Sequence, residues 1–212
     1  MKITKNQMKI TKNNLKTELA SLSDANEIAN LHYTQIKTGF LSSLGKKFLT
    51  ILYKSLIKEQ EGIVVILKNS DDDKTLGFVS GTSDLKKIYF KIILKNFPQL
   101  TISILPKLFD IKNIRKIAET FFYPKNLPKD IPESETLSLV INPKFQGQGL
   151  GKILFLEYAK ILKKRGINMT RFVIGKDLIN SHKMVKKFGA KKVCSINIHK
   201  EEESILYTYK IE

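Results

Sequence analysis

The chain has 212 residues, of which 42% are hydrophobic, so it is long enough for one domain with a real apolar core. Its net charge of +17 predicts attraction to polyanions such as a phosphate-bearing cofactor, nucleic acid or an anionic membrane surface, although a lysine-rich solvated surface explains it equally well. The single cysteine, Cys194, excludes an internal disulfide, and no apolar run suits a membrane span or a signal peptide. We therefore expect a cytoplasmic protein.

The N-terminal residues 1–14 contain a polar, basic heptad written twice with one change, and we expect a flexible tail. A single domain is predicted over residues 15–212. Its first strand lies within residues 16–22. Asp24 and Glu27 have the spacing of a capping box, which predicts that a helix begins there. His32 falls on or beside the apolar face of that helix, where a core histidine is more common than a catalytic one.

A second helix and a pair of strands follow. The apolar positions of this helix recur at helical spacing and are Leu44, Phe48, Leu49, Leu52, Tyr53 and Leu56. Residues 62–67 and 76–82 are predicted to be strands joined by a polar turn. The carboxylates of that turn are too bunched for a calcium loop, and we expect no metal site.

Residues 84–123 are an unusually long connection. Leu85, Ile88, Tyr89, Ile92 and Ile93 form an apolar stripe, and helical spacing resumes between 111 and 121. Pro98 and Pro106 interrupt the pattern, which predicts two or three short helices inserted between strands. The nearby lysines, Lys86, Lys87, Lys91 and Lys95, lie away from most of the stripe and are predicted to face solvent or an acidic ligand.

The rest of the chain is organised around residues 135–152. An apolar run at 137–141 predicts a buried strand, and Asn142-Pro143 ends it. A glycine-rich turn then enters a helix whose apolar face is Leu150, Ile153, Leu154, Tyr158, Ile161 and Leu162. Glycines before the unpaired amides of a helix N-terminus form a cradle for a pyrophosphate. The spacing fits neither a Walker loop nor a dinucleotide fingerprint.

Residues 168–175 are predicted to form another strand. A short helix carrying Ile179, Met184, Val185 and Phe188 follows and ends at Gly189. Residues 192–199 and 204–211 are predicted to form a closing hairpin, with Cys194 on its first strand.

The glycine-rich turn matches the pattern Gln/Arg-x-x-Gly-x-Gly/Ala at Gln146, Gly149 and Gly151. Together with the preceding strand and proline and the following helix, it resembles the acyl-CoA motif of the GNAT superfamily of N-acetyltransferases. The order of elements over residues 16–211 also resembles that family, apart from the insertion. The resemblance implies an α/β (α+β) fold: a mixed, mostly antiparallel twisted sheet with splayed central strands, flanking helices and a helical insertion between strands 3 and 4.

The resemblance also implies acetyl-CoA as cosubstrate and a set of residues that hold it. The backbone of Leu139, Val140 and Ile141 would pair with the pantetheine arm, and Gln146 would brace the loop. The remaining implied positions are Gly147, Gln148, Gly149, Leu150, Gly151 and Lys152 for the pyrophosphate, with Asn180 and Ser181 at the start of the late helix.

The positions where many members of that family carry catalytic residues hold other residues in this chain. Many relatives carry a tyrosine as general acid where this chain has Val185, and a glutamate where it has Val173. A base must still take the proton of the attacking amine. Glu135 is the first candidate for this base. An equally weighted interpretation is that Glu135 is only an exposed carboxylate at the edge of a strand. Glu133 and His32 are weaker candidates.

The predicted function is transfer of an acetyl group from acetyl-CoA to an amine of a small molecule, sugar or peptide, by direct attack in a ternary complex. The alternative is a catalytically degenerate acyl-CoA-binding module of the same fold. The sequence has no aromatic–basic motif or recognition helix, so we do not expect a nucleic-acid partner. We expect a monomer or a homodimer.

Three roles remain open for the insertion at 84–123. Its helices are expected to form a wall or lid over the acceptor end of the cleft, to contact a membrane surface or second subunit peripherally, or to add a packing layer.

Overall fold

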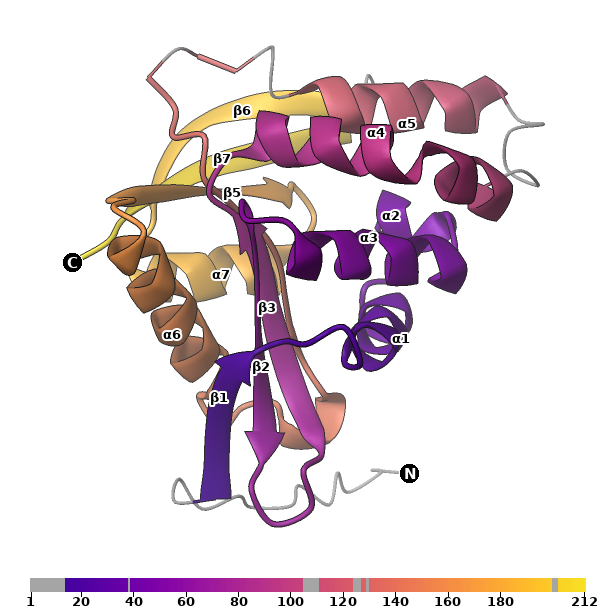
Figure 1. Cartoon of the computed structure of the whole chain (residues 1–212). Coiled ribbons are helices and arrows are strands. Elements are labelled where there is room, and N and C mark those ends of the chain that lie inside the picture. Colours follow the sequence, from indigo (N-terminus) through magenta and orange to yellow (C-terminus); the bar gives the residue numbers. More distant parts are fainter. Residues whose placement is uncertain (1–13, 38, 105–110, 124–126, 129, 200–201) are drawn as a thin grey trace, which may run out of the picture.

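The computed structural model is built on one seven-stranded sheet with strand order β1-β2-β3-β4-β5-β7-β6 (Figure 1). It describes residues 14–37, 39–104, 111–123, 127–128, 130–199 and 202–212. Neighbouring strands run antiparallel except β4 and β5, which are parallel. The predicted fold class, a mixed and mostly antiparallel sheet with flanking helices, is confirmed. The predicted N-terminal tail lies almost wholly outside the described residues.

The elements follow the predicted order closely. The strands are β1 (Leu15–Leu19), β2 (Gly62–Asn69), β3 (Thr75–Thr82), β4 (Glu135–Ile141), β5 (Met169–Gly175), β6 (Lys191–His199) and β7 (Glu202–Lys210). The helices are α1 (Ala25–Gln35), α2 (Phe40–Ser43), α3 (Lys46–Lys58), α4 (Leu85–Ile104), α5 (Ile111–Phe122), α6 (Leu150–Lys164) and α7 (Ile179–Phe188), with a short 3₁₀ helix at Pro143–Phe145.

The sheet opens between β4 and β5. The two strands pair only at Glu135 opposite Arg171, at the start of β4, whereas β4 pairs with β3 from end to end apart from one bulge. Backbone groups of β4 beyond this pair therefore face a gap on the β5 side instead of a ladder partner. The central strands are splayed as the sequence predicts.

A β-bulge interrupts β4 where the gap begins. Ser80 of β3 pairs with Ser138 and Gly81 pairs with Thr136, so Leu137 has no partner on β3. An extra residue in one strand breaks the alternation of side chains and often lies beside an active site. The side chains of Leu137 and Ser138 consequently line the same cavity, although they are neighbours in the chain.

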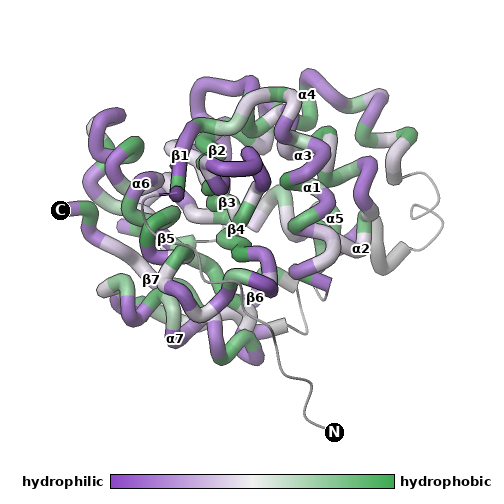
Figure 2. Tube along the Cα trace, turned by 90° about the horizontal axis from the view of Figure 1, so that it is seen from below, coloured by the Kyte–Doolittle hydropathy of each residue, from purple (hydrophilic) through white to green (hydrophobic). Residues whose placement is uncertain are grey.

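Two hydrophobic cores cover the two faces of the sheet. One contains buried side chains of α1, α3 and α4, including Ile28, Leu49 and Ile92. The other contains buried side chains of α6, including Leu154 and Tyr158, with Val185 of α7. Figure 1 shows α6 and α7 on one side of the central strands and α1 and α3 on the other. Figure 2 shows hydrophobic stretches gathered along the central strands, with hydrophilic stretches toward the outside.

The helix α4 runs through Pro98, so the prediction that this proline interrupts the helix is wrong. A proline removes one helical hydrogen bond and bends the axis, but packing on both sides can hold the helix together. Here Ile92 and Leu100 flank the proline, and both are buried in the core of the α3 side. Pro106 lies outside the described residues.

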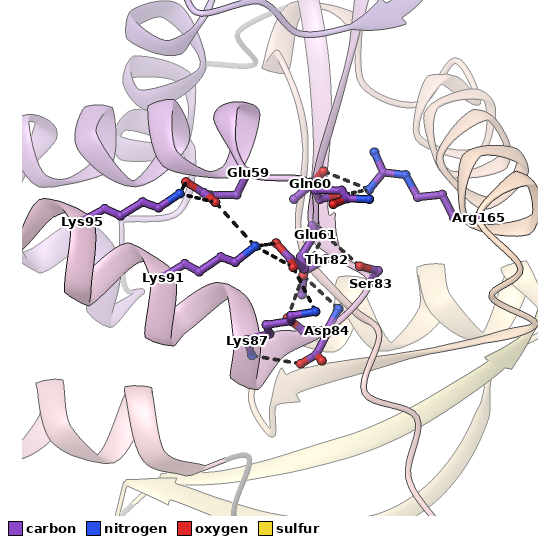
Figure 3. A network of polar contacts seen from close by, with 11 residues as sticks. Glu59, Gln60, Glu61, Thr82, Ser83, Asp84, Lys87, Lys91, Lys95 and Arg165 are labelled. Atoms are coloured by element: carbon purple, nitrogen blue, oxygen red, sulfur yellow. Dashed lines mark hydrogen bonds and ion pairs between the residues drawn. The ribbon is translucent and has the colours of Figure 1, made fainter.

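The sequence predicts that the lysines of α4 face solvent or an acidic ligand. In the structure, three of them bind carboxylates of the chain itself. Lys91 Nζ lies 2.6 Å from the Glu61 carboxylate, and Lys95 Nζ lies 2.7 Å from that of Glu59 (Figure 3). Lys87 reaches Glu61 at 3.4 Å. Lysines spaced one helical turn apart thus bind the connection between α3 and β2, which holds the inserted helix against the sheet. The opposite edge of α4 exposes Phe90, Leu94 and Phe97.

The predicted capping box at the start of α1 is also wrong. Asp24 makes no side-chain cap and instead accepts hydrogen bonds from the Ser21 amide and hydroxyl. The Glu27 carboxylate accepts a hydrogen bond from Thr75 Oγ1 at 2.8 Å. Both side chains are therefore used in tertiary contacts. Among the described helices, none is long and apolar enough to cross a membrane.

Candidate active site

The glycine loop between β4 and α6 has the geometry of an anion cradle. Gly147 and Gly149 adopt φ angles of 81° and 78°, which side chains disfavour. Gly149 is the N-cap of α6, and a Cβ added there would meet no atom within 4 Å. The first turn of α6 contains no acidic residue. Open space, a glycine cap and the positive end of a fifteen-residue helix together suit a bound phosphate.

Side chains hold this loop in place. Gln146 Nε2 donates to the Ile141 carbonyl at 3.0 Å, so Gln146 braces the loop against the end of β4. Asn142 Oδ1 accepts from the Lys144 amide at 3.2 Å, and Phe145 is buried in the core beneath α6. A fixed loop presents its amides without an ordering cost when an anion binds.

The open edge of β4 leads away from this loop. A Cβ on Gly151 would lie 3.3 Å from Leu139 Cδ2, so the first turn of α6 packs directly on β4. The same position is 3.8 Å from Met184 Sδ of α7. Asn180 lies one helical turn before Met184 and therefore shares its face, whereas Ser181 is half-buried on the next position. The structure thus brings Leu139, Gly151 and Met184 of α7 together beside the gap.

The other implied cofactor residues differ in exposure. Lys152 is exposed on the first turn of α6, and Gln148 is half-buried in the loop. Val140 and Ile141 are buried, as is the side chain of Leu150, so these residues can offer a ligand only their backbone groups.

A cavity lies on the other face of β4, under the inserted helices. It has a volume of about 20 Å³, room for about one water molecule. Leu137 and Ser138 supply its β4 wall, α4 supplies Tyr89, and α5 supplies Thr120 and Phe121. The remaining lining residues are His32, Leu41, Leu52, Tyr53, Leu56 and Ser80. The cavity and the glycine loop therefore approach β4 from opposite faces of the sheet.

His32 lies in the wall of this cavity and is 2% exposed. Its Nδ1 is 2.6 Å from the Tyr53 hydroxyl. Burial lowers the pKa of His32 to about 4, because the charged ring would lose its hydration. The histidine is therefore a neutral, hydrogen-bonded core residue, and it also faces the cavity. Burial likewise raises the pKa of the Tyr53 hydroxyl, which stays protonated.

Glu135 is neither exposed nor free. It is 4% exposed at the point where β4 meets β5, and Arg171 Nε donates to its carboxylate at 2.6 Å. Tyr123, at the end of α5, donates its hydroxyl to the same carboxylate. Burial raises the pKa of the Glu135 carboxyl, while Arg171 and Tyr123 stabilise its ionised form. The exposed-edge interpretation of Glu135 is wrong, because the parallel pairing buries this end of the strand.

The buried ion pair also ties the insertion to the sheet. Arg171 Nη1 donates to the Pro132 carbonyl at 2.6 Å, and its other terminal nitrogen has no partner among the described residues. Glu133, the other weak candidate, forms a half-exposed ion pair with Lys86 at 2.9 Å. The polar groups of Glu135 therefore hold three segments together: the end of α5, the start of β4 and the start of β5.

Sequence reasoning missed Tyr53, Tyr123 and Arg171 as parts of the site. Arg171 is followed by the apolar residues Phe172, Val173 and Ile174, and a charged side chain beside such a run is a signal for a buried partner. Val173 is half-buried, and Val185 is buried in the core of the α6 side. Neither valine can donate or accept a proton. Among the described residues, no cluster of side chains suits a metal ion.

Comparisons with known proteins agree with this geometry. The model of the acetyltransferase (GNAT) family matches residues 111–190, which include β4, the glycine loop, α6, β5 and α7. No curated protein sequence matches the chain significantly.

Solved structures show the same fold at low identity. Ard1 from Thermoplasma volcanium is 9% identical with a TM-score of 0.59, and the match covers 94% of this chain and 99% of that one. A variant of spermidine N-acetyltransferase SpeG from Vibrio cholerae is 9% identical with a TM-score of 0.56, covering 94% and 95%. The N-acetyltransferase PaiA from Thermoplasma acidophilum, in complex with coenzyme A, is 12% identical with a TM-score of 0.53, covering 92% and 98%.

Proposed function

We propose that the chain is an acetyltransferase of the GNAT family, whose model matches residues 111–190, and that it transfers the acetyl group of acetyl-CoA directly to an amine in a ternary complex. One observation carries this proposal. The edge of β4 that β5 leaves unpaired joins a phosphate cradle on the α6 face to a small cavity on the α3 face. A thioester lying along that edge would meet an amine held in the cavity.

The residues present fit the cofactor. The amides at the start of α6, beside Gly149, would hold the pyrophosphate, and Lys152 would add a positive charge nearby. The backbone of Leu139, which has no ladder partner on β5, would take the amide-rich pantetheine arm as an extra strand, while the Ile141 carbonyl already accepts from Gln146. Asn180 and Ser181 lie at the start of α7, on the other side of the gap. PaiA, a structural relative, is known in complex with coenzyme A.

The reaction needs a donor for the developing oxyanion and an acceptor for the amine proton. The bulge at Leu137 frees backbone groups of β4 from the β3 ladder beside the cavity, and an amide there suits the oxyanion. Tyr53 and His32 are placed to accept the proton of the amine. As the amine nitrogen bonds to the thioester carbon, its proton passes to the Tyr53 oxygen, and the Tyr53 proton passes to His32 Nδ1, 2.6 Å away. The C–S bond then breaks, and CoA leaves as the thiolate, which takes up the transferred proton through solvent.

As a candidate base, His32 fits this role better than Glu135. His32 is neutral and lines the cavity, whereas the Glu135 carboxylate is occupied by Arg171 and Tyr123. Glu135 is a positioning residue in this proposal, because it fixes the point from which β4 and β5 diverge. Its effect on the reaction would be exerted through the strands.

The second candidate function is an acyl-CoA-binding module without chemistry. Val185 and Val173 favour it, since neither can serve as the acid or base that relatives carry at these positions. Release of free thiol from acetyl-CoA in the presence of an amine panel separates the two candidates. Amine-dependent release supports the transferase. Cofactor binding without release on any amine supports the module.

A further inference from the structure

We infer that the acceptor is a compact amine carrying an apolar group, aromatic or branched aliphatic, and not a polycation or an aminosugar. This inference rests on the proposed function, because it takes the cavity beneath α4 and α5 as the acceptor site. The lining decides the class of acceptor: it combines aromatic rings and leucines with a few hydroxyls.

The cavity wall carries no charged side chain at neutral pH. Its lining includes no Asp, Glu, Lys or Arg, and its one titratable imidazole, His32, has a pKa of about 4. A second ammonium group in such a wall would lose its hydration without gaining a counter-charge, which is costly. The same environment favours the free-base form of the reacting amine, which is the form that attacks.

The nearby carboxylates are engaged elsewhere. Glu61 binds Lys91, Glu59 binds Lys95, and Glu135 binds Arg171. The first two lie in the network of Figure 3, and none of the three lines the cavity. The recess next to that network, about 460 Å³, is polar and lies by Arg165 at the end of α6, away from the glycine loop at its start. The carboxylates that could bind a polycation are therefore already paired with basic side chains and do not line the cavity.

Two aromatic rings from the inserted helices meet in the wall of the cavity. Tyr89 of α4 and Phe121 of α5 meet edge to face with ring centroids 5.0 Å apart, and both line the cavity. With room for about one water molecule, the cavity admits an acceptor only when this pair moves apart. An apolar group then replaces the ring-to-ring contact with contacts of the same kind, whereas a polar group would lose hydration to do so. The Tyr89–Phe121 pair thus favours the same class of acceptor as the uncharged lining of the cavity does.

The insertion supplies a matched pair of variants on adjacent residues. Tyr89 is 7% exposed and lines the cavity, whereas Phe90 is 66% exposed on the outer side of α4. Tyr89→Ala should raise the KM for an apolar amine about tenfold and leave acetyl-CoA affinity unchanged. Phe90→Ala should change neither value.

Thr120 supplies a gain-of-function test. It is half-buried on α5 and lines the cavity, so a carboxylate there can reach an entering ammonium group. Thr120→Asp should narrow or reverse a preference against polyamines. Thr120→Asn has nearly the same shape without the charge and should keep that preference.

The experiment compares phenethylamine, isopentylamine, spermidine and kanamycin as acceptors with acetyl-CoA, using the full chain. We expect kcat/KM for the two apolar amines to exceed those for spermidine and kanamycin by about 10- to 100-fold, the value of burying one such group. Faster turnover of spermidine or kanamycin would overturn this inference and leave the transferase standing.

A binding measurement separates failure of this inference from failure of the proposed function. If no amine releases thiol, calorimetry of phenethylamine against the CoA-loaded protein still tests the cavity. Binding that Tyr89→Ala weakens and Phe90→Ala does not would support the inference without turnover. Absence of phenethylamine binding to the wild-type chain would overturn it.

Discussion

The glycine loop and the cavity beneath α4 and α5 build binding sites in opposite ways. The loop is continuous in sequence and works through backbone amides, so a short stretch around Gly147 and Gly149 defines it. The cavity is assembled from side chains of α1, α2, α3, β3, α4, α5 and β4. The comparison shows why the cofactor half of such a site can be predicted from the sequence and the acceptor half cannot.

The largest expected effect breaks the loop. Gly149→Asp places a side chain and a negative charge in the open space at a φ of 78°. The loss of two or so anion–amide bonds, each worth roughly 1.5–3 kcal/mol, should weaken acetyl-CoA about 10²- to 10⁴-fold by calorimetry. Gly166→Asp is the matched control, since Gly166 has a φ of 76° and equally open surroundings at the other end of α6. Unchanged affinity in Gly149→Asp would reject the cradle.

The next largest effect is expected from removing the ion pair that joins β4 to β5, between the two regions. Glu135→Gln leaves Arg171 as an uncompensated buried charge, which should lower the free energy of unfolding by about 3–5 kcal/mol in urea. Replacing both partners, as Glu135→Gln with Arg171→Met, should recover much of that loss because no isolated charge remains. Equal destabilisation by the single and double variants would show that the ion pair does not hold β4 against β5.

The smallest of the three effects sharpens the account of the cavity. The folded pKa of His32, about 4, lies below its ordinary 6.5, so only the unfolded chain binds a proton between these values. The contribution to stability is complete above pH 6.5 and is lost as the pH falls toward 4, by about 3 kcal/mol in all.

Comparison with His32→Gln isolates this histidine from the acidic groups that titrate in the same range. Urea unfolding at a series of pH values should give a shallower decline for the variant between pH 6.5 and 4. Parallel declines for the two chains would mean that His32 is hydrated and charged in the folded state.

Much of the fold could be predicted because its signals are local. The strand at 137–141, the glycines and the apolar face of the following helix predict β4, the loop and α6 to within two residues. His32 on a helix with Ile28 and Leu31 was predicted to be a core residue, and its 2% exposure confirms this. Helical and strand periodicity report burial directly, so these elements needed no tertiary information.

The parts that could not be predicted depend on pairing between distant segments. The bulge at Leu137 exists only in the register of β4 against β3. The burial of Glu135 follows from its position opposite Arg171, thirty-six residues later in the chain. Pro98 remains inside α4 because Ile92 and Leu100 pack on the core. Each of these facts is set by tertiary contacts that override a local preference.

The central claim is that cofactor and acceptor meet at the open edge of β4 from opposite faces of the sheet. Initial velocities of thiol release, with acetyl-CoA and the fastest amine of the panel both varied, test it most directly. Because both must be bound at once, the double-reciprocal plots should intersect. Parallel lines would reveal an acetylated enzyme intermediate and would contradict direct transfer across β4.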